Sequence, residues 1–204
     1  MPKLRLTVTE ERAQKEALTR YERFLPTLTL KKLQLQVEVN RVRRERREIA
    51  QEKDAFFSRV KPWVAVLAED AGLDGFAGRL EMKAGTANVA GVFVPVAWDV
   101  RHVPGEYGLY DTPLWVDAAL EAVGSLAVLT ARDRILSEEE DILSRELAYT
   151  LQRVNLFEKV KIPEARENIR KIRVYLADQQ AAAVVRGKIA KAKAAAGHRE
   201  GAAP

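Results

Sequence analysis

Apolar residues recur at every seventh position through the first third of the chain. This line consists of Tyr21, Leu28, Leu35, Val42, Ile49, Phe56 and Trp63. A second line, three residues out of step, runs from Leu18 to Leu67 and is interrupted by Lys32, Arg46 and Lys53. Alternating steps of three and four place both lines on one helix face, and a repeat of this length is typical of a coiled coil. We therefore expect a long N-terminal helix over residues 9–70, whose basic seam positions can fix the register of its partner.

Proline and glycine suggest where this helix begins, bends and ends. Thr9, followed by two glutamates, resembles a helix N-cap. Pro26 falls inside the heptad pattern and predicts a kink or short break near residues 23–25, because proline cannot donate its amide and clashes with the preceding turn. The alternative is a separate helix that begins at Pro26. Glycines at positions 72, 75 and 78 are expected to end the helix.

Residues 72–112 have a different period. Apolar residues alternate with other side chains from position 92 onwards, and the residues on the more apolar face are Val92, Val94, Val96, Trp98 and Val100. Period two predicts a strand, and residues 79–83 are a candidate hairpin partner across a turn at 84–88. Pro95 indicates an edge position.

The remainder of the chain reads as helices over residues 113–195. Thr112 and Pro113 resemble a helix start, and apart from Gly124 nothing forbids a continuous helix from Trp115 to Lys161. A seven-residue line then returns at Ile162, Ile169, Leu176, Ala183 and Ala190, supported by Ala165 and Ile172. The predicted fold is mainly α: one elongated domain over 1–204, with a long antiparallel two-helix coiled coil from the N- and C-terminal regions. A small β-hairpin and a short helix lie in the middle, and residues 196–204 form a flexible tail.

Charge is distributed unevenly over the 204 residues. Residues 1–61 contain 16 basic and 9 acidic side chains, residues 62–152 contain 6 and 15, and residues 153–199 contain 12 and 4. Both ends are therefore basic, which suits a polyanion or an acidic protein partner. There is no cysteine, which excludes disulfide and thiolate chemistry. No apolar run approaches the roughly 20 residues of a membrane helix, so we expect a soluble intracellular protein without direct membrane insertion.

Catalytic and cofactor motifs are not apparent. The two histidines, His102 and His198, are far apart in sequence, and neither a P-loop nor a nucleophile elbow is present. The acidic run 138–141 is a candidate cation site but is better explained as a solvated helix face. The basic run 41–47 is a candidate nucleic-acid contact, although it contains no interleaved aromatic residue. We predict a mechanical or scaffolding protein with no catalytic, cofactor or metal site.

Four segments resemble a known family. They are LPTLTLKKLQLQ (residues 25–36), VAGVFVPV (89–96), DTPLWVD (111–117) and RVNLFEKVKIPEARENIRKIR (153–173). In this order they resemble the D subunits of the V-type (archaeal-type, A/V) rotary ATPase/ATP synthase in its bacterial form. The resemblance covers nearly the whole chain, and the segment around residues 154–172 is its most specific part.

The resemblance implies a non-catalytic rotor shaft of the central stalk. The paired termini would enter the catalytic A/B hexamer, and the middle of the chain would lie near the F subunit and the socket subunit of the membrane ring. It also implies a cytoplasmic protein, peripheral on the inner face of the membrane, that couples ion translocation to ATP synthesis or hydrolysis. The competing interpretation from the residues alone is a coiled-coil scaffold or a nucleic-acid-binding rod, which DNA binding with a steep salt dependence would distinguish. No nucleic-acid partner is expected if the chain is a shaft.

Overall fold

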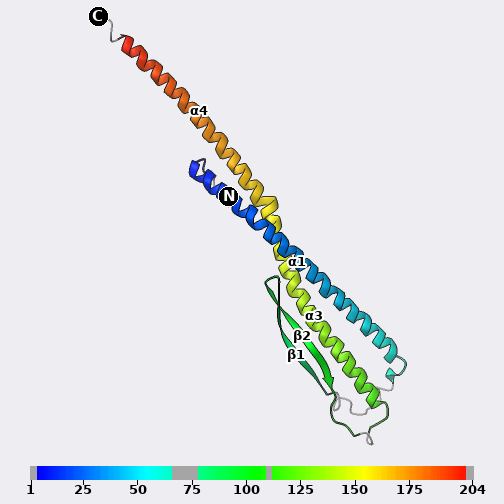
Figure 1. Ribbon diagram of the computed structural model, residues 1–204. Coiled ribbons are helices and arrows are strands. Elements are labelled where there is room, and N and C mark those ends of the chain that lie inside the picture. The colour runs from blue at the N-terminus through cyan, green and yellow to red at the C-terminus, as the bar shows by residue number, and fades with distance from the viewer. Residues whose placement is uncertain (1–3, 66–77, 109–111, 201–204) are drawn as a thin grey trace. The chain divides into compact units, whose positions relative to one another are not determined.

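The computed structural model describes residues 4–65, 78–108 and 112–200, with side chains described up to residue 193. Its elements are α1 (Val8–Val60), β1 (Arg79–Val89), β2 (Val92–Val103), α3 (Val116–Leu156), a π-helix η2 (Phe157–Lys161) and α4 (Ile162–Glu200) (Figure 1). The prediction of a mainly helical protein with one small antiparallel hairpin is confirmed.

Helix α1 differs from its predicted boundaries at both ends. It begins at Val8 rather than after a cap at Thr9, because the Thr7 hydroxyl accepts a hydrogen bond from the Glu10 amide at 3.3 Å. It continues through Pro26 as one helix, so the alternative of a separate helix starting there is wrong. It ends at Val60, ten residues before the expected position 70. Pro62 explains this end, since a proline disfavours helical geometry in the residue before it.

The hairpin is longer than predicted and turns at a different place. Residues 84–88, expected to be the turn, belong to β1, and the turn is instead formed by Ala90 and Gly91. Both have positive φ, 50° and 81°, as a two-residue hairpin turn of type I′ requires. The Gly91 amide donates to Asn88 Oδ1 at 2.9 Å and holds the turn closed. Pro95 lies within β2 of this two-stranded sheet, paired with Thr86.

A long helix follows the hairpin, as the sequence allowed from Trp115 onwards. Helix α3 covers 41 residues, because Gly124 is tolerated in its interior and no proline follows until Pro163. It begins at Val116 rather than at Pro113, since residues 113–115 form a turn in which the Val116 amide donates to the Pro113 carbonyl at 3.0 Å. Helix α4 remains helical to Glu200, into the segment predicted as a tail. Residues 201–204 lie outside the described part of the chain.

Contacts divide the chain into two units. Unit 2 is Leu30–Leu151 and contains the second half of α1, the hairpin and most of α3. Its core consists of Leu35, Val39, Val42, Val94 and Leu143. Within it α1 and α3 are antiparallel, since Lys31 pairs with Glu146 and Lys53 with Asp133.

Unit 1 is Met1–Thr29 with Gln152–Pro204. Here the first part of α1 runs antiparallel to α4, with Glu22 paired to Arg166 and Glu11 to Arg173. Among its described side chains, the buried ones are Val154 near the end of α3 and Ile162, Ala165, Ile169 and Ile172 of α4. Helix α1 thus packs against α4 in one unit and against α3 in the other. The prediction of a single elongated domain over 1–204 stays a prediction.

Candidate functional site

The residues predicted to form the coiled-coil seam occupy three kinds of environment. Leu35, Val42, Ile49, Phe56, Ile162, Ile169 and Ile172 are buried. Tyr21, Leu28, Trp63 and Leu176 are half-buried, and Ala183 is exposed. Ala183 has no covering helix because α1 begins at Val8 and its ion pair to α4 reaches only Arg173. In the described part of α4, every residue from 177 to 193 is exposed. A functional role for this set of residues stays a prediction.

The sequence pattern missed several buried residues of α3. They are Val116, Ala119, Leu120 and Thr150. These positions carry no sustained heptad line, because α3 is covered by the hairpin as well as by α1 and so buries more than one face. The sequence signal that could have revealed them is an apolar face of this helix broader than the narrow seam of a two-helix coiled coil.

The four predicted hairpin residues are not equivalent. Val94 is fully buried in the core of unit 2, and Val92 and Val96 pack partly buried against that core. Trp98 is 56% exposed, and its indole lies over Gly85 of β1, where a methyl group would come within 2.8 Å of Cη2. A bulge opposite Glu81–Lys83 and a positive φ of 60° at Asp99 follow Trp98 directly. The irregular backbone separates Trp98 from the buried Val100.

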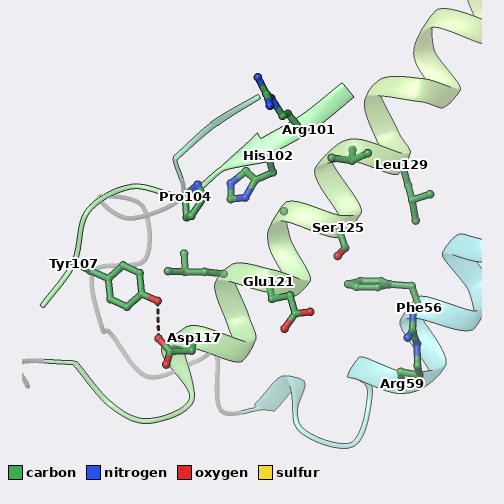
Figure 2. Close-up of a pocket in the computed structure, with 13 residues that line it drawn as sticks. Phe56, Arg59, Arg101, His102, Pro104, Tyr107, Asp117, Glu121, Ser125 and Leu129 are labelled. Atoms are coloured by element: carbon green, nitrogen blue, oxygen red, sulfur yellow. Dashed lines mark hydrogen bonds between the residues drawn. The ribbon is translucent and has the colours of Figure 1, made fainter. Parts of the chain in front are cut away.

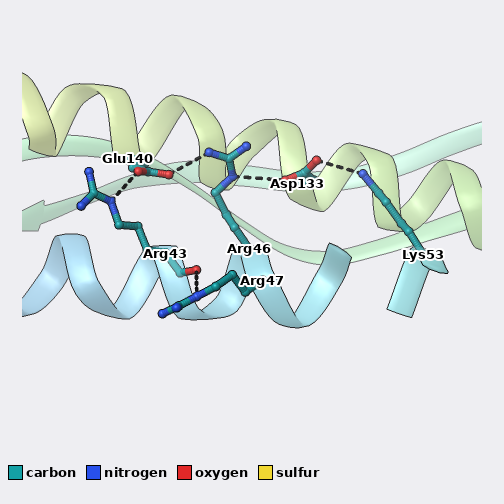
Figure 3. Close-up of polar contacts among 6 residues, drawn as sticks. All are labelled: Arg43, Arg46, Arg47, Lys53, Asp133 and Glu140. Carbon is teal, nitrogen blue, oxygen red and sulfur yellow. Dashed lines mark hydrogen bonds and ion pairs between the residues drawn. The ribbon is translucent and has the colours of Figure 1, made fainter. Parts of the chain in front are cut away.

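Ion pairs between α1 and α3 form a connected polar network in unit 2 (Figure 3). Arg43 Nε and Arg46 Nη1 both donate to Glu140, each at 2.7 Å. Arg46 Nε also reaches Asp133 at 3.2 Å, and Lys53 Nζ approaches the other Asp133 oxygen at 2.9 Å. Arg46 and Lys53 are two of the basic residues that interrupt the apolar line of α1. Arg46 therefore links two carboxylates of α3, a geometry that favours one register between the helices.

These pairs stabilise the ionised carboxylates. Hydrogen bonding to Lys53, and then to Arg46, lowers the pKa of Asp133, and Arg43 and Arg46 lower the pKa of Glu140. Glu140 in turn raises the pKa of the Arg46 guanidinium. The carboxylates are only partly exposed, 32% and 17%, so their attraction is less screened than that of a surface pair.

Glu139 occupies a different environment. Its side chain is 4% exposed and accepts a hydrogen bond from Arg41 Nη2 at 2.8 Å. Burial raises the pKa of Glu139 despite the attraction of Arg41. Arg41 is shared with Glu38 and Glu45, and these bonds keep its guanidinium charged.

The two charged runs of the sequence therefore contact one another. The acidic run was expected to be a solvated face; this is wrong for Glu139 and Glu140, which accept from arginines of α1. Glu139 and Glu140 lie on the face of α3 that packs against α1, and the sequence alone did not reveal which face that is. Arg41, Arg43 and Arg46 are correspondingly committed to carboxylates, which leaves the basic run less charge for a polyanion.

Several hollows lie beside α3. One, of about 680 Å³, is bounded by Phe56, His102, Tyr107 and Glu121 (Figure 2), and the Tyr107 hydroxyl donates to Asp117 at 2.6 Å within it. Another, of about 730 Å³, is an apolar groove between β1 and α3 lined by Leu80, Met82, Val123 and Ile135 among others. Among the residues described, no three His, Asp or Glu side chains gather as a metal site. Within the same residues, none of the helices combines the length and apolar character that a bilayer crossing requires.

Comparison with known proteins identifies the family. A family model for the D subunit of ATP synthase matches residues 10–192. The V-type ATP synthase D subunit of Borreliella burgdorferi is 37% identical over 191 residues, covering 94% of this chain and 95% of that protein. The subunits of the same name in Chlamydia abortus and Chlamydia caviae are 36% and 33% identical, each over 93% of both chains. The resemblance of the four sequence segments is thereby confirmed, and the chain belongs to the family of V-type ATP synthase D subunits.

Proposed function

We propose that this chain is the rotor shaft in the central stalk of a V-type ATP synthase. Its paired helices would enter the A/B hexamer and turn there, coupling ion translocation through the membrane ring to ATP synthesis or hydrolysis. Catalysis would take place on the A/B subunits, and this chain would contribute no catalytic residue. It would act at the inner face of the cell membrane, as a peripheral cytoplasmic subunit.

The observation that carries this proposal is the antiparallel packing of α1 within each unit, in a member of this family. In unit 2 the buried side chains of α1 form an apolar seam of Leu35, Val39, Val42, Ile49 and Phe56. Ion pairs cross from α1 to α3 in unit 2 and from α1 to α4 in unit 1. Ion pairs between the two helices of a pair oppose both sliding and rotation of one helix against the other. A helix pair with these properties can transmit torque without separating.

Coupling would follow from asymmetry. Ion pairs, hairpin and core lie on particular faces of the helices, so a turning shaft presents a different surface to each A/B pair in succession. A surface that binds one conformation of a pair better than another shifts its population towards that conformation. The F subunit and the socket subunit are the proposed partners of the lower stalk, and no nucleic acid is needed.

Rotation of a labelled chain tests the proposal. The chain has no cysteine, so Thr86→Cys on the exposed outer face of the hairpin gives a unique attachment point for a bead. With A, B and F subunits reconstituted and the hexamer fixed to glass, ATP should drive rotation of the bead in one direction. The matched control carries the same label on a chain mixed with the F subunit alone.

Failure of the labelled chain to assemble with A and B, or ATP turnover without bead rotation, would contradict the shaft role. The scaffold alternative is tested in parallel by DNA binding at increasing salt. We expect no binding at moderate salt, whereas a nucleic-acid-binding rod would show an affinity that falls steeply with salt concentration.

A further inference from the structure

Unit 1 contains an interruption of regular helix between α3 and α4. The five residues of η2 are wound as a π-helix, and the Ile162 amide donates to the carbonyl of Phe157, five residues earlier. A regular α-helix joins residues four apart. Such wide turns are rare and usually mark an extra residue or a functional position.

The spacing of the buried residues explains why an extra residue is accommodated here. From Ile162 onwards the buried positions follow at steps of three and four, through Ala165, Ile169 and Ile172. The preceding buried residue is Val154, eight positions before Ile162 rather than seven. In a regular helix eight residues would leave Ile162 about 80° around the axis from Val154. The wide turn absorbs the additional residue, and both side chains remain buried.

Pro163 reinforces the interruption. It has no amide hydrogen, and in regular helix its ring would clash with the carbonyl of Lys159. The wide turn ends at Lys161, two residues before it. Pro163 therefore removes one backbone hydrogen-bond donor from the first turn of α4, directly after the wide turn of η2.

The facing segment of α1 is weakened as well. Tyr21 stacks on Phe157, with ring centroids 5.3 Å apart and ring planes at 24°. Pro26 follows inside the helix and removes another backbone bond. Thr27 and Thr29 donate their hydroxyls to the carbonyls of Phe24 and Leu25 at 2.8 and 2.9 Å, a pattern that tends to bend helices.

We propose that these two segments, residues 21–29 and 157–163, form a compliant joint in the helix pair of unit 1. The backbone bonds that resist twist are depleted in both helices within neighbouring turns. The aromatic stack and the buried residues that follow keep the helices in contact while the joint deforms. The inference rests on the proposed shaft function, in which such a joint would store twist between steps of rotation.

A deletion tests the structural basis of the joint. Removing Lys159 together with Pro163→Ala and Pro26→Ala restores a seven-residue spacing and both missing amides. This straightened chain should keep its helical circular dichroism and thermal midpoint. Amide exchange over residues 157–163 should slow at least tenfold. The matched control deletes exposed Arg170 with the same two substitutions; it turns Ile172 about 100° out of the seam and should lower the midpoint.

Equal loss of stability on deleting Lys159 and Arg170, or unchanged exchange in the straightened chain, would overturn the joint. In the reconstituted rotary complex, the straightened shaft should still rotate, with a narrower angular distribution of the bead during catalytic pauses. Rotation with an unchanged distribution overturns the joint but leaves the shaft function standing. A wild-type chain that does not rotate overturns the shaft function itself.

Discussion

Gly124 lies inside α3, where alanine would ordinarily stabilise the helix, yet we expect Gly124→Ala to destabilise this protein. Alanine is favoured over glycine in a helix interior by about 1 kcal/mol. At this position, however, the side chain of His102 lies directly against the glycine. An added methyl group would lie 2.8 Å from Cγ and 3.1 Å from Cβ of His102, and closer still to Nδ1.

The balance can be worked out from these contacts. Both Cγ and Cβ lie near the backbone of β2, so His102 cannot withdraw by moving a flexible end alone. Overpacking of this kind costs about 1–3 kcal/mol. This exceeds or cancels the gain in helix propensity, and the net loss in free energy of unfolding should be as much as about 2 kcal/mol.

A double-mutant cycle in urea, followed by circular dichroism at 222 nm, isolates the effect. A His102→Ala background removes the contacts with Cγ and Nδ1 and leaves only the 3.1 Å contact with Cβ, so Gly124→Ala should destabilise much less there, or stabilise by up to about 1 kcal/mol. The matched control is Gly187→Ala in α4, where an added methyl group meets nothing within 4 Å, and helical signal should only increase. If Gly124→Ala stabilises equally with and without the imidazole, the packing of His102 against α3 is refuted.

Three further predictions concern charge, turn and tip. The lowered pKa values of Asp133 and Glu140 mean that their contribution is complete above the ordinary carboxyl pKa of about 4 and is lost as pH falls through the lowered values. Asp133→Asn with Glu140→Gln should therefore reduce stability at pH 7 and flatten the acid limb of the thermal midpoint between about pH 5 and pH 2; an acid limb as steep as that of the wild type would count against the ion pairs. Ala90→Asn should stabilise the hairpin by about 0.5–1 kcal/mol, because asparagine tolerates the positive φ at this turn, and a lower midpoint in urea would argue against the type I′ turn. Ala183→Leu with Ala190→Leu should slow rotation-coupled ATP hydrolysis without changing the thermal midpoint, since both positions are exposed; unchanged hydrolysis would show that a slim tip is irrelevant to turning.

The sequence was sufficient for features that depend on local period and residue type. Heptad spacing from Tyr21 to Phe56 indicated a long helix with one buried face, and alternation from Val92 indicated a strand. Helix and strand periods are properties of neighbouring residues, so a single chain displays them directly. Two of the four segments that carried the family resemblance, residues 25–36 and 89–96, overlap these stretches.

The position of the hairpin turn and the ends of the helices were predicted less well from the sequence. The hairpin turn at Ala90 and Gly91 was assigned instead to residues 84–88, because alanine has no intrinsic preference for positive φ and β1 carries few β-branched residues. The pairing of eleven and twelve strand residues decided the register.

Only the tertiary structure decided which helix faces meet. The acidic run of α3 read as solvated until Glu139 and Glu140 were found opposite arginines of α1, and the extra residue before Ile162 was visible only when Val154 proved to be buried on the same seam. Neither a charged residue nor an eight-residue spacing between apolar residues determines, within its own helix, whether the side chain is buried or exposed. Its energy depends on the group brought against it by chain segments about a hundred residues away, and that juxtaposition is a property of packing rather than of local sequence.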